Sequence, residues 1–243
     1  MQFQILGPLR ICAGTGEQVP VRSRHERTVL GLLLMRHGHA VSADQLVEAL
    51  WPQRPPVSYV SNLQTYVSRL RERLPGVPIE HVNGSYRITV DAADLDAAVF
   101  RREVAMGRAA LDGGDPVEAA ARLRHAVALW RGRPLADLSV AALEPEIAQL
   151  EAERLTAVED RIDAQLAVGG STDGDDVLAE LHRLVVEHPL RERLHGQLLV
   201  ALCRAGRRVD ALGAYQRARD LLVEELGIEP GPQLRRIHQE ILI

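Results

Sequence analysis

The segment that most restricts the fold of this chain is 58–74, Ser-Tyr-Val-Ser-Asn-Leu-Gln-Thr-Tyr-Val-Ser-Arg-Leu-Arg-Glu-Arg-Leu. With a period of about 3.6 residues, Leu63, Val67, Leu70 and Leu74 fall on one face of a helix. Amide, hydroxyl and guanidinium groups fall largely on the other face. These groups can hydrogen-bond to bases and phosphates in the DNA major groove. Taken alone, the pattern fits an ordinary solvated helix face equally well.

The segments around this helix give the predicted order of strands, three helices and a hairpin. Residues 3–11 alternate like a strand broken at Gly7-Pro8, and residues 19–21 are expected to begin another short strand. Earlier helices are predicted at 24–36 and from the Ser42 capping box up to Trp51.

A hairpin is predicted after the polar-faced helix. Alternating residues over 79–90 flank Asn83-Gly84, the strongest short-range hairpin signal. The whole order predicts a winged helix-turn-helix with an added N-terminal sheet. Its third helix would enter the major groove and its hairpin would form the wing.

The remainder of the chain is predicted to be helical. Residues 114–122 resemble residues 206–214, and the aligned Ala119 and Ala211 lie 92 residues apart. That spacing is somewhat under three tetratricopeptide periods of about 34 residues. A flexible loop is expected at 169–175. The predicted fold class is therefore an α+β winged helix followed by an all-α, tetratricopeptide-like domain, mainly α overall, with domains 1–92 and 93–243. A generic Ala-rich bundle is the alternative for the second domain.

Charge differs between these two predicted domains. Residues 1–92 carry 10 Arg and 7 acidic residues, whereas residues 93–243 carry 19 Arg and 26 acidic residues. A net charge of +3 beside one of −7 indicates that only the first domain touches a polyanion.

The apolar run 29–35 is too short to span a bilayer, and the N-terminus lacks a basic signal region. The predicted location is cytoplasmic and nucleoid-associated, with no membrane partner, and Cys12 and Cys203 are expected to be thiols.

No pattern in the sequence predicts catalysis. All 29 basic residues are Arg, so a P-loop lysine and a Schiff-base lysine are excluded. The sequence has no His-x-x-x-His pair, no Gly-x-Ser-x-Gly and no Gly-x-Gly-x-x-Gly. We therefore predict that the protein is not an enzyme and takes no cofactor and no metal.

The motifs resemble those of one known family over essentially the whole chain. Leu46-Val47-Glu48-Ala49-Leu50-Trp51 and 63–71 resemble an OmpR-type winged helix. Ala128-Leu129-Trp130-Arg131-Gly132, 188–195, 215–219 and 224–232 resemble the bacterial transcriptional activation domain (BTAD). Together these motifs are similar to those of the Streptomyces antibiotic regulatory protein (SARP) family.

The resemblance implies a pathway-specific activator of an antibiotic biosynthetic gene cluster. Such a protein would bind direct repeats next to the promoter −35 region, with a second copy of itself side by side on the DNA. It would recruit RNA polymerase, including its sigma factor. Because the chain ends at Ile243, we expect a short member without the ATPase and sensor regions of longer ones.

Site residues follow from the same resemblance. The residues expected to contact bases are Gln64, Thr65 and Arg69. Those expected to contact phosphates are Ser61, Tyr66, Ser68, Arg71 and Arg87. Many members carry Arg, Lys or Asn early in the recognition helix, where this chain has Val60 and Ser61. Weaker candidates are therefore Arg54, Tyr59, Arg73 and Asn83.

Two other functions stay open on the sequence. A tetratricopeptide-type adaptor would use its winged helix only for protein contacts. A metabolite-sensing regulator would bind a small molecule in its helical domain.

Overall fold

The structure, a computed structural model, describes residues 1–169 and 174–243. These residues form two compact units. Unit 1 comprises Met1–Ala105 with Arg124–Leu155, and unit 2 comprises Met106–Leu123 with Thr156–Ile243. Four residues of the loop expected at 169–175, residues 170–173, lie outside the described part of the chain. No helix among the described residues is long and apolar enough to cross a membrane.

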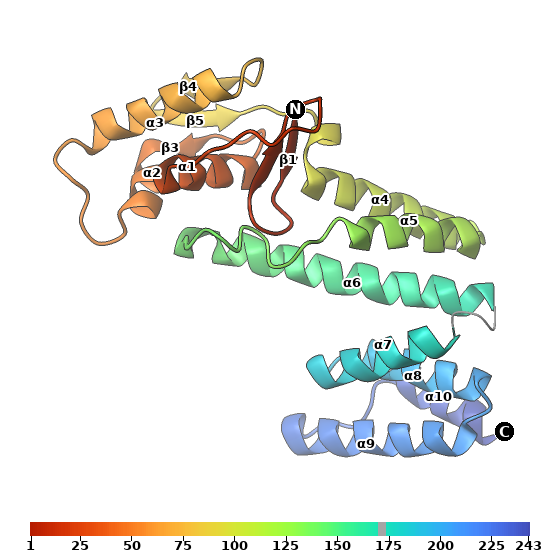
Figure 1. The fold of residues 1–243 in the computed structure, drawn as a ribbon. Helices are drawn as coiled ribbons and strands as arrows, with labels where there is room; N and C mark the ends of the chain where they lie inside the picture. Colours follow the sequence, from red (N-terminus) through yellow and green to blue (C-terminus); the bar gives the residue numbers. More distant parts are fainter. Residues whose placement is uncertain (170–173) are drawn as a thin grey trace. The chain divides into compact units, whose positions relative to one another are not determined.

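Unit 1 contains all the strands of the described chain, and Figure 1 labels most of the elements. Its strands are β1 (Gln2–Gln4), β2 (Arg10–Cys12), β3 (Val41–Ser42), β4 (Ile79–Val82) and β5 (Ser85–Ile88). Its complete helices are α1 (Arg24–Met35), α2 (Ala43–Leu50) and α3 (Tyr59–Arg73). Helices α4 (Asp96–Asp112), α5 (Pro116–Ala128) and α6 (Glu144–Val168) contribute residues to both units. Short 3-10 turns cover Ala92–Asp94 and Ala141–Leu143.

The predicted winged helix is present. Strands β1 and β2 pair antiparallel, with Phe3 opposite Ile11. A second sheet has the order β3-β5-β4, in which Tyr86 lies opposite both Val41 and His81. The turn between β4 and β5 places Asn83 at a φ of 51° and Gly84 at a φ of 75°. A turn with both central residues at positive φ matches the right-handed twist of the strands, which is why Asn-Gly signals a hairpin.

Apolar stripes hold α1, α2 and α3 together above this sheet. Leu30, Leu33 and Leu46 are fully buried, as is Leu70 of α3. Ser23 is the N-cap of α1, and its hydroxyl accepts the Glu26 N–H. The predicted capping box of Ser42 and Gln45 starts α2. One sequence prediction was wrong, because residues 19–21 form no strand. Pro20 has no N–H to donate to a ladder.

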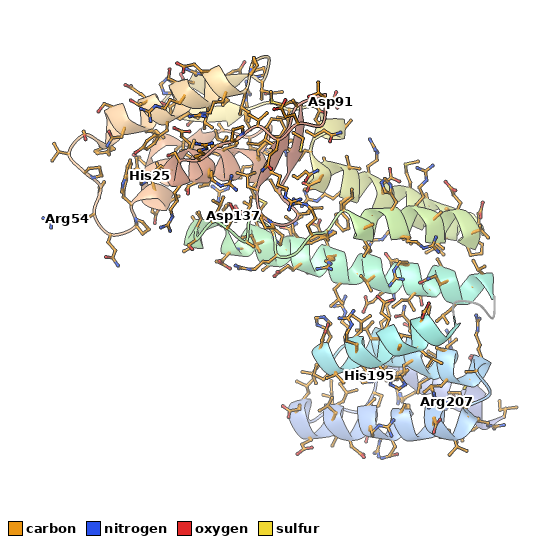
Figure 2. The ribbon with its side chains drawn as sticks, in the orientation of Figure 1. His25, Arg54, Asp91, Asp137, His195 and Arg207 are labelled. Carbon is orange, nitrogen blue, oxygen red and sulfur yellow. The ribbon has the colours of Figure 1, made fainter. Side chains whose placement is uncertain are left out.

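Residues beyond 92 complete the packing of the N-terminal sheet in unit 1. The buried Asp96 carboxylate accepts the backbone N–H groups of Ile5 and Leu6, at 2.8 and 3.0 Å. The Arg131 N–H donates to the Leu6 carbonyl at 2.8 Å. Asp137 accepts the Leu9 N–H at 2.7 Å and also pairs with Arg27 of α1. Figure 2 labels Asp137. Unit 1 therefore contains residues 93–105 and 124–155, which the sequence prediction placed in the second domain. The boundary at residue 92 stays a prediction about which part of the chain carries which function.

Unit 2 is all helical. Besides its parts of α4, α5 and α6, it contains α7 (Gly174–Glu187), α8 (Glu192–Arg204), α9 (Arg208–Leu226) and α10 (Pro232–Leu242). Helix α8 packs against α7, α9 and α10, and short connections join it to α7 and α9. The aligned Ala119 and Ala211 are both fully buried, and each follows a left-handed glycine, Gly114 or Gly206. The predicted fold class, winged helix plus tetratricopeptide-like helical domain, is confirmed.

Candidate DNA interface

Helix α3 has one apolar face and one polar face, as its sequence predicts. Leu63, Val67 and Leu70 are buried, with exposed fractions of 2%, 1% and 0%. They pack α3 against the rest of unit 1 and so fix which side faces outward. The exposed residues of the helix include Ser61, Gln64, Thr65, Ser68, Arg69 and Glu72. Of the predicted contact residues on α3, Tyr66 alone is half-buried.

The polar side chains on this face differ in how they are engaged. Ser61 Oγ donates to the Ser58 carbonyl at 3.0 Å, and Thr65 Oγ1 donates to the Ser61 carbonyl at 2.8 Å. Their oxygens keep the capacity to accept. Gln64 and Ser68 make no side-chain hydrogen bond with any described residue. The Gln64 amide thus has both donors and its acceptor available, the combination that pairs with an adenine edge.

Two arginines of α3 lie against a buried acid of α1. Arg69 Nη1 is 3.6 Å from Glu26 Oε1, and Arg73 Nε is 3.4 Å from Glu26 Oε2. Glu26 is 1% exposed, and its Oε2 accepts no hydrogen bond from the described residues. Arg73 also donates to the Pro20 carbonyl at 3.2 Å. The carboxylate therefore orients both guanidinium groups on the α1 side of the polar face. Neither contact has the geometry of a hydrogen bond, so the two guanidinium groups are held by charge attraction without tight fixation.

Arg71 joins α3 to the wing. Its Nε and Nη2 donate to the Ile79 carbonyl of β4 at 2.9 and 2.6 Å. The third guanidinium nitrogen is not used in these bonds. Arg71 thus holds the wing against α3.

The wing presents one charged pair near its turn. Arg87 of β5 donates to Glu80 of β4 at 2.6 Å, and both side chains are exposed. His81 stacks on Tyr86 with ring centroids 4.6 Å apart. The Ala43 N–H donates to the Gly84 carbonyl at 3.0 Å, which fixes the turn to the first residue of α2. Asn83 is exposed in that turn.

An aromatic cluster supports the middle of α3. The Tyr66 ring stacks on His25 of α1 at 5.3 Å and lies 6.4 Å from Trp51. The half-buried Tyr66 ring therefore packs against other aromatic rings, and its use as a phosphate contact stays a prediction. Tyr59 is at the start of α3 and 36% exposed. Arg54 lies on the loop between α2 and α3, and Figure 2 labels it there together with His25.

Two basic residues at the start of α1 were not among the predicted contact residues. Arg22 and Arg24 are exposed and form no ion pair within residues 1–169 and 174–243. They flank Ser23 and lie four and two residues before Glu26, which pairs with Arg69 and Arg73. The sequence does indicate this basic cluster, since residues 22–27 contain three Arg and one His but only one acid, Glu26.

Residues 1–169 and 174–243 contain no group of three or more His, Cys, Asp or Glu placed to hold a metal ion.

Two family models match this chain. The one described as "Bacterial transcriptional activator domain" matches residues 95–242, and "Transcriptional regulatory protein, C terminal" matches residues 16–87. Both descriptions are of transcriptional regulators, not of enzymes.

Curated relatives are similar over the whole chain. It is 34% identical to Regulatory protein DnrI of Streptomyces peucetius over 254 residues, covering 92% of DnrI. It is 38% identical to Transcriptional regulator RedD of Streptomyces coelicolor over 255 residues, covering 70% of RedD. It is 35% identical to Regulatory protein AfsR of Streptomyces griseus over 242 residues, and spans 24% of the length of AfsR.

A solved structure has the same fold. Mycobacterium tuberculosis EmbR, in complex with a low affinity phosphopeptide, matches with a TM-score of 0.91 and 34% identity. The match covers 99% of this chain and 64% of the EmbR chain. The chain therefore belongs to the Streptomyces antibiotic regulatory protein family of transcriptional activators, with an OmpR-type winged helix and a bacterial transcriptional activation domain.

Proposed function

We propose that the protein is a sequence-specific DNA-binding activator of a secondary-metabolite gene cluster, acting in the cytoplasm at the nucleoid. The observation that carries the proposal is the polar face of α3, which its buried leucines turn outward beside a wing. An exposed helix of this kind next to a hairpin is the docking geometry of winged helix-turn-helix proteins. If the protein were an adaptor that used its winged helix only for protein contacts, the exposed Gln64 amide, which has no hydrogen-bond partner among the described residues, would have no assigned role.

The direct reading of bases is assigned to Gln64, Thr65 and Arg69. A Gln amide pairs with adenine, and an Arg fork pairs with the O6 and N7 acceptors of guanine. Arg69 lies close enough to Glu26 for orientation, and the separation of 3.6 Å leaves its guanidinium able to turn toward a base.

The positioning of the helix on the backbone is assigned to hydroxyls and cations around this face. Ser61, Tyr66 and Ser68 would contact phosphates from α3. Arg71 and Arg87 would contact phosphates near the wing. Arg54, Tyr59, Arg73 and Asn83 are further candidates at the edges of the interface. Exposed Arg22 and Arg24 extend the basic character on the α1 side.

Activation is assigned to the rest of the chain. We infer that residues 1–92 carry the DNA-binding function and residues 93–243, with a net charge of −7, carry the contacts to RNA polymerase and its sigma factor. Stacked helix pairs present extended surfaces that bind other proteins. Two copies would lie side by side on direct repeats next to the −35 region, because a head-to-tail contact suits repeats in one orientation.

The test is a footprint of the full chain on the promoters of the genes beside its own. A protected pair of direct repeats, with affinity that falls as salt rises, is the expected result. Gln64→Ala should reduce the preference for the operator over random DNA by about 1–3 kcal/mol. Gln216→Ala in α9 is the matched control, since Gln216 is exposed and bonds only Asp220 among the described residues. The proposal fails if no promoter is protected, or if both variants behave alike.

A further inference from the structure

Helices α6, α8 and α10 of unit 2 surround a hollow of about 530 Å³. A second hollow of about 390 Å³ adjoins it and shares Val200, Arg204, Ile237 and Glu240 with it. Because the two hollows share these wall residues, we describe them together as the α8–α10 cleft. Figure 1 labels both helices, which are in direct contact. The larger hollow alone is within the range of about 300–1,000 Å³ that small-molecule sites occupy.

The acids that line the cleft already have partners. Asp163 Oδ2 accepts from Arg193 at 2.6 Å, and its Oδ1 accepts from the Gln197 amide at 2.7 Å. Glu192 Oε2 accepts the Gly231 N–H at 2.6 Å. These contacts stabilise the helix packing. The negative charge of Asp163 is compensated by Arg193, whereas Glu192 is bonded to a neutral backbone N–H.

Three of the arginines that line the cleft have no close hydrogen-bond or ion-pair partner among the described residues. Arg204 and Arg208 form no hydrogen bond and no ion pair with any residue that the structure describes. Arg236 Nε is 3.8 Å from Glu240 Oε1, which is beyond hydrogen-bond distance. Arg204 of α8, Arg208 of α9 and Arg236 of α10 therefore line the cleft beside one loosely paired carboxylate, which gives these walls a surplus of positive charge.

Between these charges the walls are apolar. Val200 of α8 and Ile237 of α10 line both hollows, and Leu166 of α6 and Leu234 line the larger one. α10 lies so close to α8 that a Cβ on Gly196 would be 3.0 Å from Ile237 Cδ1.

The wall also contains a buried polar atom without a partner. Gln197 lines the larger hollow and is 4% exposed, and its Oε1 accepts no hydrogen bond within the described chain. A buried acceptor in that condition costs free energy unless a donor reaches it. A bound molecule with a hydroxyl or N–H group would supply that donor.

We propose that the α8–α10 cleft binds a small organic anion. Its apolar body would lie against Val200 and Ile237, and its acidic group would be held by Arg204 and Arg236. The Gln197 carbonyl would accept from a hydroxyl or N–H group of the same molecule. The site lies entirely within unit 2 and does not depend on the proposed DNA binding.

Two fluorescent probes test the charge requirement on the full chain. Anilinonaphthalene sulfonate is an aromatic anion, and phenylnaphthylamine has nearly the same body without the sulfonate. We expect saturable binding of the anion with a stoichiometry of one, and binding of the neutral probe that is weaker by at least about tenfold, since hydrogen bonds to a charged group carry this much affinity. Decanoate should displace the anion, and decanol should not.

Variants then assign the binding to the cleft. Arg204→Gln combined with Arg236→Gln should weaken binding of the anion by at least about tenfold. Arg235→Gln is the matched control, since Arg235 is an exposed neighbour on α10 that does not line the cleft. Val200→Trp should block the apolar wall and abolish binding, while circular dichroism shows an unchanged helical content. Equal binding of both probes, no saturable binding, or equal effects of the double variant and the control would each overturn the proposal.

Discussion

At the scale of single residues, Glu26 positions two arginine side chains of α3 by pairing with them. It is nearly fully buried and lies at the start of α1, where the helix N-terminus stabilises a carboxylate. Arg69 and Arg73 approach it from α3. Removing one arginine would leave a buried acid with less compensation, so a DNA-binding defect in such a variant has to be separated from a folding defect.

The first prediction uses this distinction. Arg69→Lys keeps a positive charge for Glu26 but loses the planar fork that pairs with guanine. We expect it to lose about 1–3 kcal/mol of preference for the operator over random DNA, and Arg69→Ala to lose the same preference with added loss of stability. Gel-shift titrations against both DNAs measure this, with Arg124→Ala on the exposed side of α5 as control. Unchanged discrimination in the Lys variant would refute the base contact.

The second prediction concerns Arg87 in the wing. Arg87→Ala should weaken binding to all sequences and lower the salt slope by about one unit, because a phosphate contact carries no base information. Glu80→Gln frees the same guanidinium from its partner and should leave the slope unchanged or raise it. Affinity measured at several salt concentrations separates the two. An Arg87→Ala variant with the parent's slope would show that the wing arginine serves only its pair with Glu80.

The third prediction concerns the buried Asp96. Burial is the largest influence and raises the pKa of this carboxyl above 3.8, although the Ile5 and Leu6 N–H groups and Arg131 oppose the shift. A carboxyl whose pKa is raised by folding stabilises the fold most below its unfolded pKa. That contribution is lost as pH rises through the folded pKa.

Asp96→Asn removes this titration. Its single amide oxygen also leaves one of the two backbone N–H groups without an acceptor, so we expect a cost of about 1–3 kcal/mol in the free energy of unfolding. The difference between parent and variant should be largest in acid and shrink as pH rises through the folded pKa. Urea unfolding at a series of pH values checks both points, and a difference that grows with pH would contradict the raised pKa.

At the scale of elements, the wing depends on its turn. Gly84 has a φ of 75°, and the Asn83 φ is 51°. Gly84→Val would force a branched side chain into the left-handed region at a cost of order 1–3 kcal/mol. We predict that this variant binds DNA more weakly on every sequence, since the wing would lose its shape. Asn83→Gly is the control, because Gly adopts the same φ freely. Equal affinity of both variants in gel shifts would remove the wing from the interface.

Two side chains of α3 that were predicted to contact DNA also pack against neighbouring elements. The Arg71 guanidinium is held by the Ile79 carbonyl, and the Tyr66 ring is stacked on His25. Both residues were predicted as phosphate contacts from the family resemblance. The structure gives each a packing partner that helical spacing alone could not identify, because those partners lie on other elements.

At the scale of the whole molecule, the fifth prediction concerns two copies on DNA. Side-by-side binding to direct repeats requires both half-sites on one face of the duplex, with centres about one helical turn apart. Inserting about 5 base pairs between the repeats should rotate one copy to the opposite face and abolish cooperative binding. An insertion of about 10 base pairs restores the face and serves as the control for distance. Unchanged cooperativity after the half-turn insertion would favour a two-fold arrangement on a palindrome.

Local patterns in the sequence were enough to predict the elements and the fold class. The Ser42 capping box, the Asn83-Gly84 turn and the leucine stripe of α3 each act over a few neighbouring residues, so their structures follow from short-range chemistry. The outward face of α3, with Gln64, Thr65 and Ser68, followed from helical periodicity in the same way. The strand expected at 19–21 failed, because a strand needs a partner and Pro20 cannot donate to one.

Only the tertiary structure decided which distant residues meet. The pairing of Arg69 and Arg73 with Glu26 joins residues more than forty positions apart, and the bonds from Ile5 and Leu6 to Asp96 span about ninety. The α8–α10 cleft likewise arises where Arg204 and Arg236 come together from separate helices. A periodic pattern tells which face of an element is buried, but not what it is buried against. That choice depends on the packing of all the elements together, because apolar burial has no direction of its own and many partners would satisfy the same stripe.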